Sequence, residues 1–136
     1  MTAVDAAGGA TDACALPRVL VVDDERDMLE ILQDFFESEG YTVQVADSGE
    51  RAIELCRHGS FDVAITDMRM PGIDGLHTLI SLRQLDPRLP VIVVTGYASD
   101  DTEQRCRNAG AFDCIQKPVD LDTLLRLVGA AVQTRD

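Results

Sequence analysis

Short apolar runs rich in Val and Ile alternate with longer amphipathic stretches from Arg18 onward. This alternation predicts β-strands and α-helices that follow one another around a parallel sheet. We expect five strands, at residues 19–22, 42–46, 63–66, 91–95 and 112–116. Because the first, third and fourth runs are almost continuously apolar, helices should cover both faces of the sheet there. The predicted fold is therefore an α/β, doubly wound, five-stranded parallel sheet.

Four of the stretches that follow the strands carry apolar residues at helical spacing. They lie at residues 28–36, 48–58, 76–82 and 121–132. Ser48 is a suitable N-cap for the second, and Gly40 is suited to a left-handed cap after the first. The fourth helix, predicted within 99–109, is almost wholly polar. Little apolar burial would anchor it, so we expect it to be the loosest element.

The chain has 136 residues, the length of one domain. Residues 1–16 are mostly Ala, Gly, Thr and Asp, without the basic start and apolar stretch of a secretion signal. We expect them to form a disordered tail, and residues 17–136 to form the domain. No apolar run approaches the ~20 residues needed to span a bilayer, so we expect a cytoplasmic protein. No second block of composition follows the last helix, so no output domain is expected.

Acidic residues outnumber basic ones by 24 to 12, which gives a formal net charge of -12. This charge opposes long-range attraction to nucleic acid and to anionic lipid, so direct contact with DNA or a membrane is not expected.

The cysteines show neither C-x-x-C spacing nor a histidine at ligand spacing, which argues against a zinc site. We expect them to stay reduced and to serve as small apolar residues. They are Cys14, Cys56, Cys106 and Cys114.

Polar residues stand at the ends of four predicted strands. Asp23 and Asp24 follow the first strand, and Asp67 follows the third. Thr95 ends the fourth strand, and Lys117 follows the fifth. In open parallel sheets, ligands bind at the carboxyl ends of the strands, so these residues should converge. Carboxylates packed together repel each other, and Mg²⁺ is the hard cation that fits them best.

A phosphoryl group would complete such a site. Its transfer needs neutralisation of the charge on its oxygens and a nucleophile placed in line. The metal ion, Thr95 and Lys117 would supply the first requirement. The Asp67 carboxylate would supply the second.

Four separated strings of the chain are VLVVDDE, ITDMRMPGIDG, VIVVTGYAS and AFDCIQKPVD. In their order and spacing they resemble the receiver domain of two-component response regulators, and in particular its single-domain, chemotaxis-regulator-like form. The resemblance covers roughly residues 18–132. It implies a flavodoxin-like strand order of 2-1-3-4-5 with helices on both faces of the sheet.

The resemblance also implies roles for the acidic residues. Asp67 would be the phosphoacceptor and would take a phosphoryl group from a sensor histidine kinase or a histidine phosphotransfer protein. Asp24 and Asp67 would bind Mg²⁺ together with the backbone carbonyl of Arg69, and Asp23 would act through a metal-bound water. Such a domain is a signalling switch that assists its own phosphorylation and dephosphorylation, and not an enzyme acting on other substrates.

The remaining motif positions concern switching. The Thr95 hydroxyl would move to bond the phosphoryl oxygen, and Lys117, followed by a cis bond to Pro118, would pair with the phosphoryl group. The family usually has Tyr or Phe three residues before the lysine, where this chain has Cys114. The aromatic rotamer switch cannot operate there, and Tyr97 is an aromatic that would take part of its role.

The output is expected to be contact with a downstream target protein through the face of the fourth helix, fifth strand and fifth helix. The same face would mediate any homodimer.

A flavin-binding protein of this architecture is a poor alternative, because the acids after the first strand repel phosphate. A degenerate receiver that acts as a constitutive interaction module stays open because of Cys114. Whether the chain is a complete single-domain regulator or part of a longer protein also stays open.

Overall fold

The computed structural model describes residues 16–96 and 100–134. Five parallel strands form one sheet in the order β2-β1-β3-β4-β5, which confirms the predicted fold. The strands are β1 (Arg18–Val22), β2 (Thr42–Ala46), β3 (Val63–Asp67), β4 (Val91–Thr95) and β5 (Asp113–Gln116). Except for residue 16, the predicted tail lies outside the described residues.

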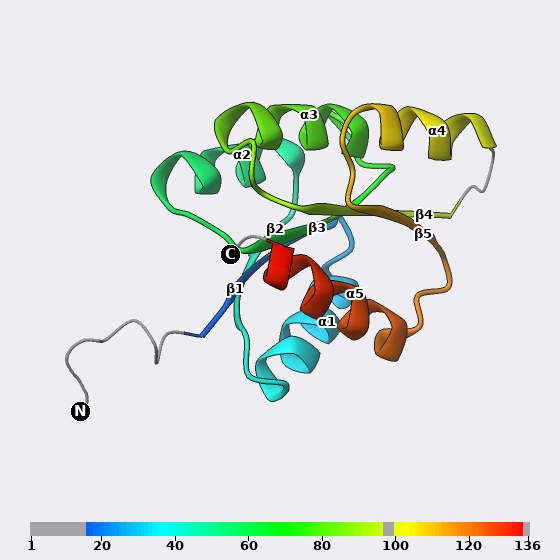
Figure 1. The fold of residues 1–136 in the computed structure, drawn as a ribbon. Coiled ribbons are helices and arrows are strands. Elements are labelled where there is room, and N and C mark those ends of the chain that lie inside the picture. The colour runs from blue at the N-terminus through cyan, green and yellow to red at the C-terminus, as the bar shows by residue number, and fades with distance from the viewer. Residues whose placement is uncertain (1–15, 97–99, 135–136) are drawn as a thin grey trace.

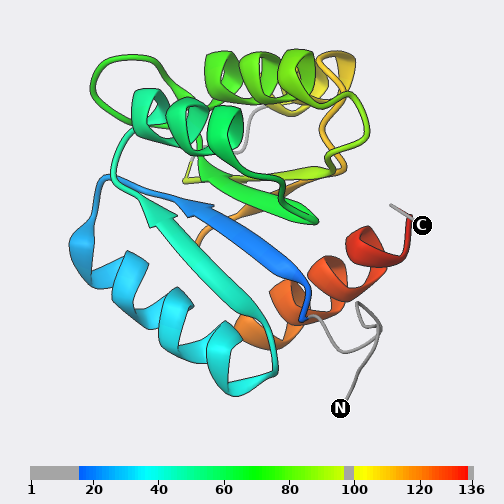
Figure 2. The same ribbon diagram turned by 90° about the vertical axis from the view of Figure 1, so that its left-hand side faces the viewer.

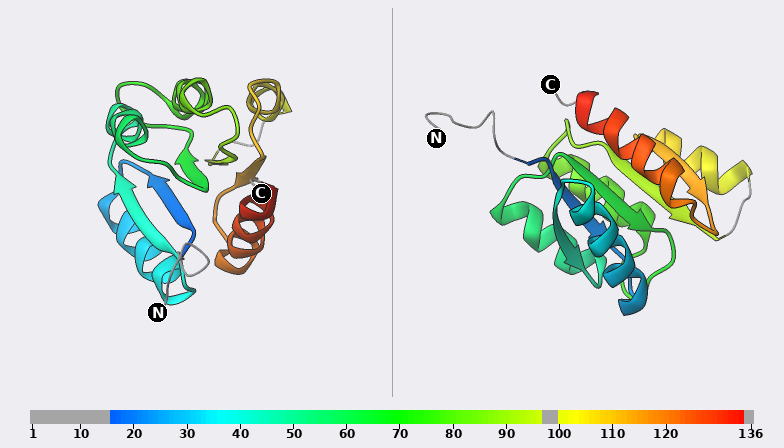
Figure 3. Two further views of the ribbon diagram at one scale, coloured as in Figure 1. Left: turned by 60° about the vertical axis from the view of Figure 1, so that its left-hand side comes forward. Right: turned by 90° about the horizontal axis from the view of Figure 1, so that it is seen from below.

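Five helices connect and follow the strands, as the sequence pattern predicted. They are α1 (Arg26–Ser38), α2 (Gly49–His58), α3 (Gly75–Leu85), α4 (Asp100–Asn108) and α5 (Leu121–Thr134). Helices α1 and α5 cover one face of the sheet, and α2, α3 and α4 cover the other (Figures 1 and 2). Figure 3 shows the same layers from two further directions. Within the described ranges, no helix has the length and apolar content needed to cross a membrane.

Local signals place the helix ends. The Ser48 hydroxyl accepts a hydrogen bond from the Arg51 N–H and caps α2, as predicted. Gly40 has a φ of 94°, which is the left-handed conformation expected after α1. Gly59 differs, because it follows α2 in an extended conformation with a φ of -163°. The second helix therefore ends without a left-handed turn.

Strand residues alternate between two cores. Val19 and Val21 of β1 pack with α1 and α5, whereas Leu20 and Val22 pack with α2 and α3. The central strands β3 and β4 are buried along their whole length. This explains why their sequences are apolar at consecutive positions.

Helix α4 has few apolar anchors. Among its described side chains, Cys106 alone is buried, and the others are exposed or half-buried. The scarcity of apolar contacts predicted from the sequence is therefore confirmed.

The packing of α1 generates a stability prediction. Phe36 is fully buried and makes edge-to-face contacts with Phe35 and Tyr41, with ring centroids 5.2 and 5.7 Å away. Replacing Phe36 by Ala should lower the free energy of unfolding in a urea titration by about 3–5 kcal/mol, because a large cavity remains. Ile31→Ala on the same helix, where the side chain is 51% exposed, should change it by no more than about 0.5 kcal/mol. Equal losses in the two variants would contradict this account of the core.

Candidate functional site

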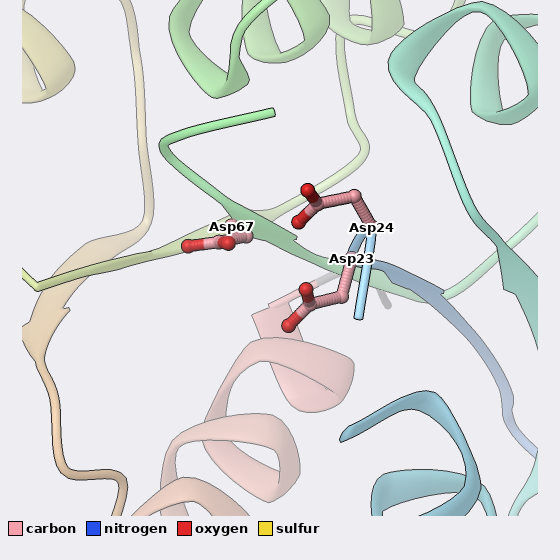
Figure 4. A group of neighbouring side chains, drawn as sticks. All are labelled: Asp23, Asp24 and Asp67. Atoms are coloured by element: carbon pink, nitrogen blue, oxygen red, sulfur yellow. The ribbon is translucent and has the colours of Figure 1, made fainter. Parts of the chain in front are cut away.

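Three carboxylates meet at the carboxyl edge of the sheet. Asp23 and Asp24 directly follow β1, and Asp67 is the last residue of the adjacent strand β3. One oxygen atom from each residue lies within 4.8 Å of the others. Figure 4 shows their side chains extending into the same space. We call Asp23, Asp24 and Asp67 the acidic cluster, and the convergence expected from the sequence is present.

The members of the acidic cluster differ in burial. Asp23 and Asp67 are only 4% and 6% exposed, while Asp24 is exposed. An Asp23 oxygen accepts a hydrogen bond of 2.9 Å from the Glu25 N–H. Beneath Asp23 and Asp67 the core leaves an enclosed space of about 10 Å³, which is too small for a ligand. A ligand of the cluster therefore cannot lie beneath these two acids, and Asp24 is the member exposed to solvent.

Lys117 points its ammonium group at the acidic cluster. Its Nζ lies 3.3 Å from an Asp67 oxygen and 4.0 Å from a Glu25 oxygen. The Lys117 N–H donates to the carbonyl of Thr95, which ties the end of β5 to the end of β4. The bond from Lys117 to Pro118 is cis, as expected. No role was predicted for Glu25, although its position directly after two aspartates was a usable signal.

Burial and repulsion perturb the charges of the site. Burial raises the pKa of Asp23 to about 6; the Glu25 N–H hydrogen bond opposes this and the Asp67 charge adds to it. Burial also raises the pKa of Asp67, and the nearby Lys117 charge only partly opposes it. Burial alone would lower the pKa of Lys117, but the surrounding acids hold it above its ordinary value.

The site holds more negative than positive charge. Three carboxylates share one close ammonium group, and two of the three are buried. A deficit of positive charge is relieved when a carboxylate is protonated or when a hard divalent cation binds the carboxylate oxygens. The residues present therefore fit a cation such as Mg²⁺, with the exposed Asp24 on its open side.

Thr95 lies between the strands that carry Asp67 and Lys117. It is 4% exposed and ends β4, which pairs with β3 on one side and β5 on the other. By strand alternation its side chain follows Val93 and so belongs to the face of α2, α3 and α4. Asp67, by the same rule, follows Ile65 on the face of α1 and α5.

The loop after Asp67 is held by glycine. A Cβ atom on Gly75 would collide with the Asp67 carbonyl and would lie 2.7 Å from the Met68 Cα. The Gly75 N–H donates to the Met68 carbonyl, and the Met68 N–H donates to the Val94 carbonyl, both at 2.8 Å. This close approach requires glycine and fixes the backbone next to the Asp67 carboxylate.

Arg69 and Tyr97, which also have predicted roles, are not part of the acidic cluster. The exposed Arg69 side chain lines, with Asp24, Asp74 and Arg105, an open cavity of about 580 Å³ between the β3–α3 loop and α4. Metal binding by its backbone carbonyl stays a prediction. Tyr97 lies outside the described residues.

Comparison with known proteins identifies the family. The sequence profile of the family described as "Response regulator receiver domain" matches residues 19–129. This chain belongs to the response regulator receiver domain family. Its receiver domain is 40% identical to the transcriptional regulatory protein ZraR of Escherichia coli strain K12 over 106 residues, which are 78% of this chain and 24% of ZraR. It is 38% identical to the regulatory protein AtoC of the same strain, covering 88% of this chain and 26% of AtoC. The chain spans about a quarter of the length of these relatives.

Solved structures of receiver domains superpose closely on this one. A CheY-like receiver domain from Methanospirillum hungatei JF-1 matches with a TM-score of 0.85 and 31% identity, covering 89% of this chain and 97% of that chain. The regulator TrrA from Thermotoga maritima, in complex with Mg²⁺ and BeF, matches with a TM-score of 0.77 and 31% identity, covering 85% and 99%. A receiver domain of a two-component response regulator is a signalling domain.

The raised pKa of Asp23 predicts a stability effect in the receiver domain without metal. Asp23→Asn should raise the free energy of unfolding at pH 7 in EDTA by an amount on the order of 1–3 kcal/mol, because it removes a buried charge and keeps an oxygen for the Glu25 N–H. Since the folded-state pKa of about 6 exceeds the ordinary 3.8, protonation of Asp23 favours the folded state.

The difference in unfolding free energy between Asp23→Asn and the wild type should thus shrink as the pH falls from 7 through 6 towards 4. Urea titrations across this range measure it. Asp34→Asn, an exposed acid on α1, is the matched control and should stay close to the wild type. If Asp23→Asn is the less stable protein at pH 7 in EDTA, the buried charge of Asp23 does not destabilise the metal-free domain and this account is wrong.

Proposed function

We propose that this receiver domain is a phosphorylation switch in which Asp67 accepts a phosphoryl group with the help of Mg²⁺. The donor is a sensor histidine kinase or a histidine phosphotransfer protein. The observation that carries the proposal is the position of the Lys117 ammonium group, 3.3 Å from Asp67 within a cluster of three carboxylates. A buried, negatively charged nucleophile with one cation beside it suits an incoming phosphoryl group that needs more positive charge around it.

The reaction is a displacement at phosphorus. An Asp67 carboxylate oxygen forms a bond to phosphorus while the bond between phosphorus and the donor's imidazole nitrogen breaks, and the imidazole takes up a proton. Lys117 neutralises charge on the phosphoryl oxygens through its ammonium group. The product is an aspartyl phosphate whose oxygens lie near the ends of β4 and β5.

Mg²⁺ would supply further neutralisation of the charge that develops on the phosphoryl oxygens. Asp24 and Asp67 would bind it with the backbone carbonyl of Arg69. Asp23 suits the role of holding a metal-bound water, because it is buried and one of its oxygens already accepts the Glu25 N–H. The TrrA complex with Mg²⁺ and BeF supports this assignment by family likeness.

Thr95 would couple the phosphoryl group to the signalling face formed by α4, β5 and α5. The threonine ends the strand next to β5, and α4 has the fewest apolar anchors among the helices described. Movement of the Thr95 hydroxyl toward the phosphoryl oxygen would favour a different position of α4 and so control a downstream target protein. The same face is the one proposed for a homodimer. The beryllofluoride-activated NtrC4 receiver domain is a dimer, and it matches this chain with a TM-score of 0.82 and 31% identity over 88% of this chain.

Phosphorylation of Asp67 is tested by intact mass. Incubation with acetyl phosphate and Mg²⁺ should add one phosphoryl group, and either Asp67→Asn or EDTA should abolish the addition. Asp34→Asn keeps the acidic cluster and should be phosphorylated like the wild type. Labelling that persists in Asp67→Asn would remove this residue as the acceptor. No labelling of the wild type would favour the alternative of a constitutive interaction module.

The role of Thr95 is tested by amide hydrogen exchange. Thr95→Ala should still be phosphorylated, but the change in exchange that phosphorylation causes in α4 should disappear, because the hydroxyl that bonds the phosphoryl group is gone. Thr42→Ala, an exposed threonine on β2, should keep the full change. If Thr95→Ala responds in α4 as the wild type does, the coupling runs through another group.

A further inference from the structure

Helix α4 is attached to the rest of the domain through one buried side chain. Cys106 is fully buried, and among the described side chains of α4 it has no buried companion. The remaining polar contacts of the helix are weaker anchors. Gln104–Asn108 and Arg107–Glu103 bind within the helix at exposed positions. Arg107 also forms a partly exposed ion pair of 3.6 Å with Asp113 of β5. Exposed ion pairs typically contribute about 0–1 kcal/mol, so Cys106 carries most of the attachment.

The partner of Cys106 is Cys114, in β5. Cys106 and Cys114 lie close enough to affect each other's thiol, and both pack in the same apolar core. This core lies between the sheet and helices α2, α3 and α4. The contact between Cys106 and Cys114 therefore connects α4, the helix predicted to move, with β5, the strand beside β4. The pair replaces the aromatic side chain that the family usually places at position 114.

Strand register links this thiol pair to Thr95. Cys114 lies opposite Val93 of β4, and Thr95 is the next residue of β4 on the same face. The thiol pair and Thr95 thus lie on the same side of the sheet. Thr95 is two residues after Val93, the residue that pairs with Cys114. A displacement of Thr95 toward the acidic cluster would withdraw a side chain from the neighbourhood of Cys114.

The chemistry of the pair suits a contact that is easily broken. Burial, with a contribution from Cys114, raises the pKa of Cys106 to about 12, so this thiol is neutral and unreactive while α4 is packed. Thiols are weak hydrogen-bond donors and acceptors. Release of α4 costs the burial of one small side chain and the partly exposed ion pair between Arg107 and Asp113, and it brings a thiol into solvent.

We propose that the Cys106–Cys114 contact is a latch that holds α4 on β5 in the unphosphorylated domain, and that its opening on phosphorylation makes Cys106 accessible. This inference rests on the proposed phosphorylation of Asp67. It adds a residue pair to the switch and predicts a chemical signature that a rigid α4 would not give.

The signature is the rate at which N-ethylmaleimide labels Cys106, measured by peptide mass mapping. In the wild type, acetyl phosphate with Mg²⁺ should raise this rate by about tenfold or more, an increase expected if the phosphoryl group shifts the opening equilibrium by ~1.4 kcal/mol. Cys56, half-buried on α2, is an internal control whose rate should not change. Intact mass on the same samples reports the phosphoryl group. Phosphorylation without faster labelling of Cys106 would overturn the latch, whereas absence of the phosphoryl group would instead overturn the proposed function.

A second arm tests the latch without phosphorylation. Cys114→Ala should raise the labelling rate of Cys106 by about fivefold, which corresponds to ~1 kcal/mol at 1.4 kcal/mol per factor of ten. Cys114→Val keeps an apolar cover over Cys106 and should label slowly, like the wild type. An unchanged rate in Cys114→Ala would overturn the latch. Faster labelling of Cys56 together with Cys106 would also overturn it, since general unfolding would then explain the exposure.

Discussion

Burial of two neighbouring carboxylates at the carboxyl edge of the sheet is the constraint on which the rest of the site depends. The fold buries Asp23 and Asp67 side by side and supplies one close ammonium group, that of Lys117 at 3.3 Å from Asp67. The packed core below the acids leaves no room for relief from that side. The charge can be balanced only from the open side, so burial of the acids favours binding of a cation there.

The alternation of side chains divides the switch between the two faces of the sheet. Asp67 continues the core shared with α1 and α5, whereas Thr95 and Cys114 belong to the core shared with α2, α3 and α4. Under the proposed function, a phosphoryl group on Asp67 would reach the second face at the strand ends, where the two layers are not separated by the sheet. A modification of Asp67 could thereby affect a helix on the opposite face of the sheet.

Much of this arrangement could be predicted from sequence, because it follows from local patterns and from topology. Apolar runs place the strands, and parallel strands bring their carboxyl ends to one edge, so the convergence of the acids with Lys117 was expected. The unequal burial of the neighbours Asp23 and Asp24 was not, since it depends on which face the strand presents after its last pair. The contact between Cys106 and Cys114 depends on how α4 packs, and its nearly apolar-free sequence carries no periodicity that would reveal it.

The energies involved indicate why α4, and not another helix, suits the moving role. A phosphoryl group can shift a conformational equilibrium only by the difference in its interactions with the two states. A hydrogen bond from a hydroxyl to a charged group typically contributes about 1.5–3 kcal/mol. Helix α1, anchored by Leu29, Leu32 and the fully buried Phe36, is held by more than that. Among the contacts described for it, helix α4 is held by one buried cysteine, the Arg107–Asp113 ion pair to β5 and exposed polar contacts, so the single hydrogen bond proposed for Thr95 would be comparable to this attachment.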